Sequence, residues 1–269
     1  MDIEKIEEIY HYSYNKYEDL YDYFLYRCWF NILSTRLTIG YQTCRIRDFV
    51  NLEEIQKKEN VQYPKESKSY SRAGKPGQVW FYISDDVNAT YAEMMPIWLR
   101  NKGYGETFYT VVSFWQVREL IEVLVIPDLT NVNIICKKMN LEPYKEHIKF
   151  WEYITCKFRE DSINNESIYE FTSAFANAII ARSTIEGQNI KGIFYPSAQL
   201  LERSNLALMP SVVDKEEISL VRVAKIKCRK NCILNIQGKP KYTTEGEYTY
   251  GYYDSDMDAF KWVESSGLY

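Results

Sequence analysis

The chain has 269 residues, of which 46% are hydrophobic and 26% are charged, enough for one large domain or two small ones. It carries 33 basic and 37 acidic residues, a net charge of −4, which argues against nucleic-acid binding driven by overall charge. We find no secretory signal and no run of about 18 apolar residues, so we expect a cytoplasmic protein without membrane contact.

Cysteine and histidine usage bears on metal binding. The two histidines and the scattered cysteines form no tetrahedral ligand pattern. We therefore expect reduced thiols and no metal cofactor. The cysteines are Cys28, Cys44, Cys136, Cys156, Cys228 and Cys232.

Residues 1–35 are predicted to be helical, because isoleucines and then tyrosines recur at steps of three and four residues. Such a tyrosine-rich face suits two partners: the rest of the same chain, or another chain in a homo-oligomer. We expect a helical N-terminal extension over 1–40, followed by one folded domain over 41–269.

The segment 37–49 reads as an early strand that contains Arg45 and Arg47. Alternation along a strand places both arginines on one face. Two neighbouring cations repel each other unless an anion such as a diphosphate lies between them. The alternative is a solvated basic face on an edge strand. The polar residues 51–70 that follow predict a loop, with or without a short helix.

The stretch 71–94 reads as a loop, a strand and a helix in quick succession. Residues 71–77 are rich in turn formers, and the β-branched and aromatic run 78–84 predicts a strand. Asp85 and Asp86 are good N-caps for a helix that begins near Val87.

Three polar residues of this stretch are spaced so that they could meet in one cleft at the end of the strand. They are Arg72 in the loop, Tyr82 in the strand and Glu93 in the helix. Taken singly, each has a plainer interpretation: a surface cation, a half-buried core tyrosine and a solvated helix face.

The rest of the chain mixes short strands with helices. Helical periodicity marks 140–160 and 167–185. Since regular βαβ alternation is absent, we predict an α+β fold. No glycine-rich dinucleotide or P-loop motif occurs. The predicted later strands are 107–117, 120–126, 192–197, 205–208, 218–228 and 232–236.

The order and spacing of Arg72, Tyr82 and Glu93, the last preceded by alanine, resemble the RES family, which is named for its Arg, Glu and Ser. The third block of that family, a Gly-Ile-x-Tyr-x-Ser strand followed by Asn, is matched by residues 192–197, which end in Ser197, and by Asn205. The resemblance covers roughly 72–210.

The sequence departs from the family pattern in two ways. Ser71 and Gly74 stand where members often have Gly and Asn, and the second and third blocks lie further apart than in compact members. These departures bear on the details of substrate binding more than on the class.

The resemblance implies an ADP-ribosyltransferase-like fold, a split antiparallel β core with flanking helices and NAD in the cleft. Here it would carry a helical insertion around 140–185. It further implies a bacterial toxin or defence effector that depletes NAD as a glycohydrolase or phosphorylase, using water or phosphate. The partner would be an Xre-like antitoxin protein.

The same resemblance suggests roles for the matching residues. Glu93 would stabilise the oxocarbenium-like transition state of nicotinamide release. Tyr82 would stack on nicotinamide, Ser197 would bind and orient rather than attack, and Asn205 would contact the cofactor.

Arg72 would clamp the diphosphate, assisted by Arg45 or Arg47. Two alternatives share these residues: a protein ADP-ribosyltransferase and a catalytically silent module that binds a nucleotide or a protein.

Overall fold

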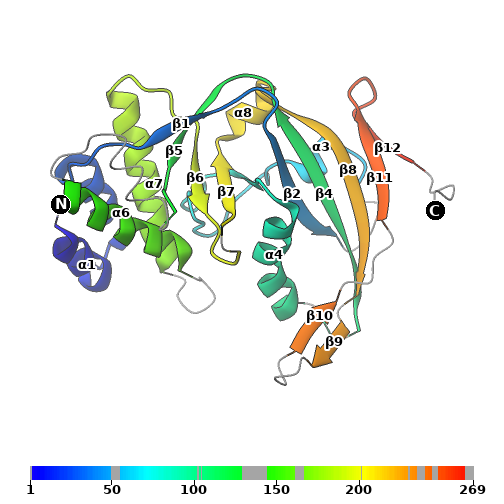
Figure 1. Ribbon diagram of the computed structural model, residues 1–269, viewed down its shortest axis with the longest axis horizontal. Coiled ribbons are helices and arrows are strands. Elements are labelled where there is room, and N and C mark those ends of the chain that lie inside the picture. Colours follow the sequence, from blue (N-terminus) through cyan, green and yellow to red (C-terminus); the bar gives the residue numbers. More distant parts are fainter. Residues whose placement is uncertain are drawn as a thin grey trace.

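The structure is a computed structural model that describes residues 2–49, 55–101, 103, 105–128, 144–160, 167–200, 202–229, 231–234, 240–243 and 248–263. In these residues, helices flank a large and mostly antiparallel sheet (Figure 1). The predicted α+β class is therefore confirmed.

The helices agree with the sequence pattern except at the N-terminus. Helices α6 and α7 fall at the predicted 140–160 and 167–185, with 140–143 outside the described residues. The expectation of helix over 1–35 is wrong beyond Arg27, because strand β1 begins at Ser34. The helices are α1 (Ile3–Tyr12), α2 (Lys16–Asp22), the π-helical η1 (Tyr23–Arg27), α3 (Lys58–Val61), α4 (Val87–Asn101), α6 (Tyr144–Arg159), α7 (Ile168–Ile185) and α8 (Pro210–Asp214).

The strands that the sequence predicts lie close to their expected positions, whereas β1, β10, β11 and β12 were not predicted. Strand β4 spans the predicted 107–117, while β3 covers only the second half of 78–84, because Gln78 closes a turn by donating its backbone N–H to the Lys75 carbonyl. The strands are β1 (Ser34–Leu37), β2 (Gln42–Phe49), β3 (Phe81–Ser84), β4 (Thr107–Val117), β5 (Ile121–Val125), β6 (Gly192–Pro196), β7 (Ser204–Leu208), β8 (Ile218–Arg229), β9 (Asn231–Leu234), β10 (Pro240–Thr243), β11 (Tyr248–Asp254) and β12 (Ala259–Trp262).

The large sheet has the strand order β1-β5-β6-β7-β3-β2-β4-β8-β11-β12, and β9 pairs with β10 separately. Its neighbours are antiparallel except β5 and β6, which α6 and α7 connect as a crossover. Strands β2 and β3 share only the Cys44–Ser84 pair, whereas β2 pairs with β4 along its whole length. The sheet therefore consists of two halves that meet at a short junction.

The N-terminal helices pack on the same chain. Ile6, Leu20 and Phe24 are fully buried in a core that includes Phe171 and Phe175 of α7. Of the two partners considered for this tyrosine-rich segment, the rest of the chain is the one confirmed. Figure 1 shows α1, α6 and α7 gathered beside β1 and β5.

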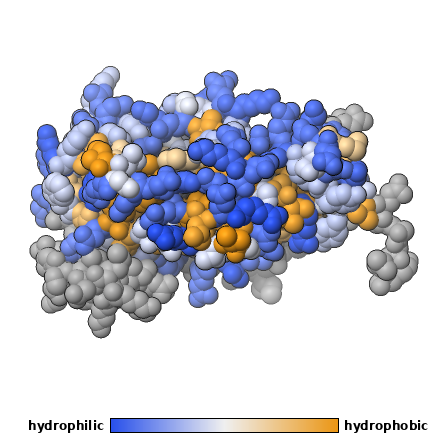
Figure 2. All heavy atoms as spheres, turned by 90° about the horizontal axis from the view of Figure 1, so that it is seen from above, coloured by the Kyte–Doolittle hydropathy of each residue, from blue (hydrophilic) through white to orange (hydrophobic). Residues whose placement is uncertain are grey.

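Helix α4 covers the half of the sheet that contains β2, β4 and β8. Its Trp98 is 2% exposed and packs in a cluster with Ile46 of β2, Val112 of β4 and Ile226 of β8. The view from above shows a mostly hydrophilic surface with hydrophobic side chains in small groups (Figure 2). Among the described helices, none combines the length and the apolar character that a membrane span requires.

Candidate functional site

A pocket of about 670 Å³ lies at the junction of the two half-sheets. Its walls come from β2, β3, the loop at 71–72, α4, the start of α7, and strands β6 and β7. Six of the seven residues singled out in the sequence line this pocket, and the seventh, Ser197, lies directly behind it. The lining residues are Arg45, Ile46, Arg47, Asp48, Phe49, Ser71, Arg72, Tyr82, Ile83, Thr90, Glu93, Met94, Ile97, Tyr169, Tyr195 and Asn205.

Helix α4 places Glu93 on the pocket wall. The Asp86 carboxylate accepts the backbone N–H groups of Asn88 and Ala89 at 2.7 and 3.2 Å, which caps the helix as expected. Thr90 lies one turn before Glu93 on the same helix face and also lines the pocket.

The Glu93 carboxylate is held on one side. Its Oε1 accepts three hydrogen bonds: from Ser197 Oγ at 2.5 Å, from Asn205 Nδ2 at 2.9 Å and from the Ala198 backbone N–H at 3.1 Å. Its Oε2 has no hydrogen-bond partner in the described part of the chain. These bonds fix the carboxylate by its inner oxygen and leave the other oxygen for a ligand. They also join α4 to β6 and β7 in the other half-sheet.

Ser197 orients Glu93 and does not line the pocket. It is 1% exposed, and its Oγ accepts the backbone N–H groups of Gln199 and Leu200 at 3.2 and 3.1 Å. With its lone pairs so used, the hydroxyl proton is directed at Glu93. The orienting role expected of Ser197 is thus directed at the Glu93 carboxylate.

Arg45 and Arg47 face the pocket from alternate positions of β2. Arg45 Nη1 donates to the Tyr82 carbonyl at 2.5 Å, and Arg47 Nη1 donates to the Asn60 carbonyl at 2.7 Å. The Arg45 Nε is buried without a hydrogen-bond partner.

Neither guanidinium forms an ion pair with a described carboxylate. Burial, and then the neighbouring Arg47, lower the pKa of Arg45; burial also lowers the pKa of Arg47, against the opposing effect of Asp48. Both side chains remain charged at neutral pH. Two neighbouring cations outweigh the single Asp48 carboxylate on this wall of the pocket and make it suitable for an anion.

Arg72 is less free than the sequence suggests. It is 8% exposed, and its guanidinium donates to the backbone carbonyls of Lys157 and Glu160 at the end of α6, at 3.3 and 2.5 Å. Its Cζ also lies 5.1 Å from the centre of the Tyr169 ring. Arg72 thus lines the pocket while part of its donor capacity is used by α6.

The Tyr82 hydroxyl also forms its hydrogen bonds with other groups of the protein. It donates to Ser71 Oγ at 2.7 Å and accepts the Ala73 N–H at 3.0 Å. Burial raises the pKa of Tyr82 to about 12. The hydroxyl therefore holds the loop that carries Arg72, and Tyr82 also lines the pocket.

Tyr169 and Tyr195 line the pocket but were not singled out in the sequence. Tyr195 lies two residues before Ser197 on β6, so strand alternation could have suggested it. Burial, followed by Tyr82 and Glu93, raises the pKa of Tyr195 well above its usual value. Tyr169 belongs to the first turn of α7, and no local pattern connects it with the loop at 71–77.

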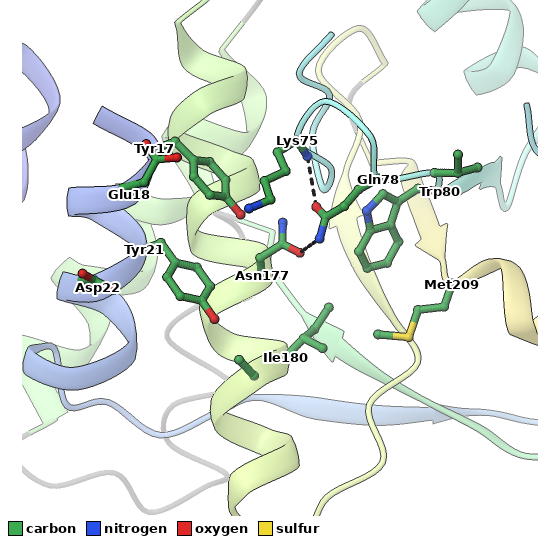
Figure 3. A pocket seen from close by; sticks show the side chains of 12 residues that line it. Tyr17, Glu18, Tyr21, Asp22, Lys75, Gln78, Trp80, Asn177, Ile180 and Met209 are labelled. Atoms are coloured by element: carbon green, nitrogen blue, oxygen red, sulfur yellow. Dashed lines mark hydrogen bonds between the residues drawn. The ribbon is translucent and has the colours of Figure 1, made fainter. Parts of the chain in front are cut away.

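A second pocket, of about 540 Å³, lies near the same loop, at residues 75–80 (Figure 3). Tyr17 and Tyr21 of α2 face it with stacked rings, and Trp80 lies opposite them. Gln78 donates to Asn177 Oδ1 of α7 at 3.0 Å. The side chains in this pocket thus connect the loop with α2 and α7.

No model of a known protein family matches this chain, and a comparison with curated proteins gives no match either. The resemblance to the RES family therefore depends on the residues and their spacing. Among the residues that the structure describes, no three His, Cys, Asp or Glu side chains are grouped to hold a metal ion.

Proposed function

We propose that this protein is an NAD-consuming enzyme of the RES type that cleaves the bond between nicotinamide and ribose. The observation that carries the proposal is the Glu93 carboxylate, which three donors hold by one oxygen at the wall of a pocket lined by arginines. The pocket volume of about 670 Å³ falls in the range of cofactor sites, about 300–1,000 Å³.

The Glu93 wall and the arginine wall of the pocket suit two different parts of NAD, the ribose and the diphosphate. Loss of nicotinamide leaves positive charge on the ribose, which a fixed carboxylate such as Glu93 stabilises. The diphosphate of NAD needs cations with directed donors, and Arg45 and Arg47 supply them without an ion pair to any carboxylate in the described part of the chain. Arg72 would add to this charge from the loop side.

The fold is consistent with the proposal. An ADP-ribosyltransferase-like core is a split antiparallel sheet with the dinucleotide in the split. Here the half-sheets meet at the single Cys44–Ser84 pair, and the pocket opens beside that junction. We propose that this split corresponds to the NAD cleft of that fold.

The acceptor of the ADP-ribose group would be water, phosphate or a protein side chain. With water the products are nicotinamide and ADP-ribose, with the water proton released to solvent. With phosphate the second product is ADP-ribose 1-phosphate. Depletion of NAD by either route would make the protein a toxin or defence effector, controlled by an antitoxin partner.

The test is product analysis after incubation of the purified chain with NAD, with and without phosphate. We expect nicotinamide from the wild type, and a loss of about 100-fold or more in rate for Glu93→Gln. Glu119→Gln, an exposed carboxylate in the β4–β5 turn, is the matched control and should keep the wild-type rate. Radiolabelled ADP-ribose on protein would indicate transfer. No product from folded wild type, with or without phosphate, would refute the proposal.

A further inference from the structure

The position of Arg72 depends on the ends of two helices far away in the chain. Its guanidinium donates to the Lys157 and Glu160 carbonyls, where α6 ends, and stacks on Tyr169, where α7 begins. The carbonyls at a helix C-terminus lack helical partners, and Arg72 satisfies two of them. A shift of either helix end would therefore move the cation in the pocket.

Helix α1 contacts both of these helix ends. Glu7 Oε1 forms an ion pair with Lys157 Nζ at 3.0 Å, and Lys157 is only 13% exposed. The same ammonium lies 4.5 Å from the centre of the Tyr10 ring. Tyr10 Oη is 3.1 Å from Ser167 Oγ, immediately before α7. Residues 7 and 10 of the first helix thus connect the last turn of α6 with the first turn of α7.

Helix α2 holds the other side of the loop that carries Arg72. The Tyr17 ring lies 5.6 Å from the Tyr70 ring and 5.0 Å from Lys75 Nζ. Figure 3 shows Lys75 directed toward Tyr17 and Gln78 directed toward Asn177. Asn177 Nδ2 also donates to the Ala73 carbonyl at 2.9 Å, so α7 is bonded to the residue that follows Arg72.

We infer that helix α1 is a positioning element for Arg72 and that Glu7 and Tyr10 set the affinity of the pocket without lining it. Both residues act through α6 and α7, since neither contacts the pocket. The link to NAD affinity rests on the proposed function, whereas the link to the loop at 71–78 does not. The N-terminal helices would then be the place where a bound partner or a modification alters the pocket.

Hydrogen–deuterium exchange of the full chain tests the structural link. Glu7→Gln removes the ion pair, and Tyr10→Phe removes the hydroxyl but keeps the ring. Glu8→Gln is the matched control, because it breaks the exposed Lys5–Glu8 pair, which is 2.8 Å long and lies on the same helix. We expect the amides of 71–78 to exchange about 3- to 10-fold faster in the two variants than in the control. Unchanged exchange at 71–78 in both would overturn the inference.

A double-mutant cycle on NAD binding separates positioning from general destabilisation. Glu7→Gln should weaken NAD binding about 3- to 10-fold in the wild type and leave it unchanged in an Arg72→Ala background. An equal loss in both backgrounds would contradict the inference. If the wild type binds no NAD, the proposed function fails, and the exchange experiment still decides whether α1 positions the loop.

Discussion

The contact between Asn205 and Glu93 can be turned into a measurable repulsion. Asn205→Asp replaces an amide by a carboxylate of the same shape, next to the Glu93 oxygen that now accepts a hydrogen bond at 2.9 Å. Asn205 is 6% exposed, so the new charge has little access to water. Two carboxylates at this separation cannot both ionise without a large cost, so the pair would share a proton.

The distance sets the size of the effect. Two unit charges 2.9 Å apart in an effective dielectric of about 20 repel by about 6 kcal/mol, and relaxation to about 4 Å still leaves about 4 kcal/mol. At about 1.4 kcal/mol per pKa unit, the pair would release its last proton about 3 to 4 units above the ordinary carboxyl range. A raised native pKa gives stability that is complete below about pH 4 and is lost as the pH rises through the raised value.

Thermal unfolding at pH 5 and pH 8 measures this effect without any assumption about function. We expect Asn205→Asp to lose on the order of 10 °C in Tm between these pH values, relative to the wild type. Asn88→Asp makes the same change at an exposed position of α4 and should follow the wild type. If Asn205→Asp showed the wild-type pH dependence, the arrangement of Glu93 and Asn205 described above would be incorrect.

Three further predictions concern the fold. Gly192→Ala would place a Cβ 2.5 Å from a backbone carbonyl of β7, so we expect a loss of about 1–3 kcal/mol in chemical denaturation; wild-type stability would contradict this packing. Phe175→Ala empties the centre of the aromatic core between α6, α7 and η1 and should cost about 3–5 kcal/mol in the same assay, whereas a loss below about 1 kcal/mol would show the ring to be dispensable. Burial raises the pKa of Glu7, but hydrogen bonds from Tyr153 and Lys157 outweigh this effect, so that the pKa is lowered. The stability that this carboxylate contributes is thus present above about pH 4.3 and lost as the pH falls. Between pH 5 and pH 3 the Tm of the wild type should therefore fall further than that of Glu7→Gln. Equal losses in Tm would refute this.

Local patterns in the sequence were sufficient for most of the secondary structure. Strand β4 follows from a run of aromatic and β-branched residues. Helix α4 begins after Asp86 because the Asp86 carboxylate caps it by accepting the backbone N–H groups of the residues two and three positions along. The helix predicted over 1–35 is too long. The periodicity of these residues does not reveal where packing on α7 ends and β1 begins.

The site was predictable where a motif carries long-range information. The resemblance grouped Glu93, Ser197 and Asn205, which only the pairing of β3, β7 and β6 brings together. The carbonyl partners of Arg72 on α6 and the approach of Tyr169 were not predictable. They depend on how the crossover between β5 and β6 packs against the loop, and no local spacing encodes that.

The measurement that tests the account most directly is hydrogen–deuterium exchange of the Glu93→Gln variant with and without NAD. Slow turnover in this variant keeps the ligand bound during labelling. We predict that NAD protects 45–49, 71–72, 195–197 and 204–205, which line or adjoin the pocket in both half-sheets. Protection confined to other segments, or none at NAD concentrations that the wild type consumes, would contradict the proposal that this pocket binds NAD.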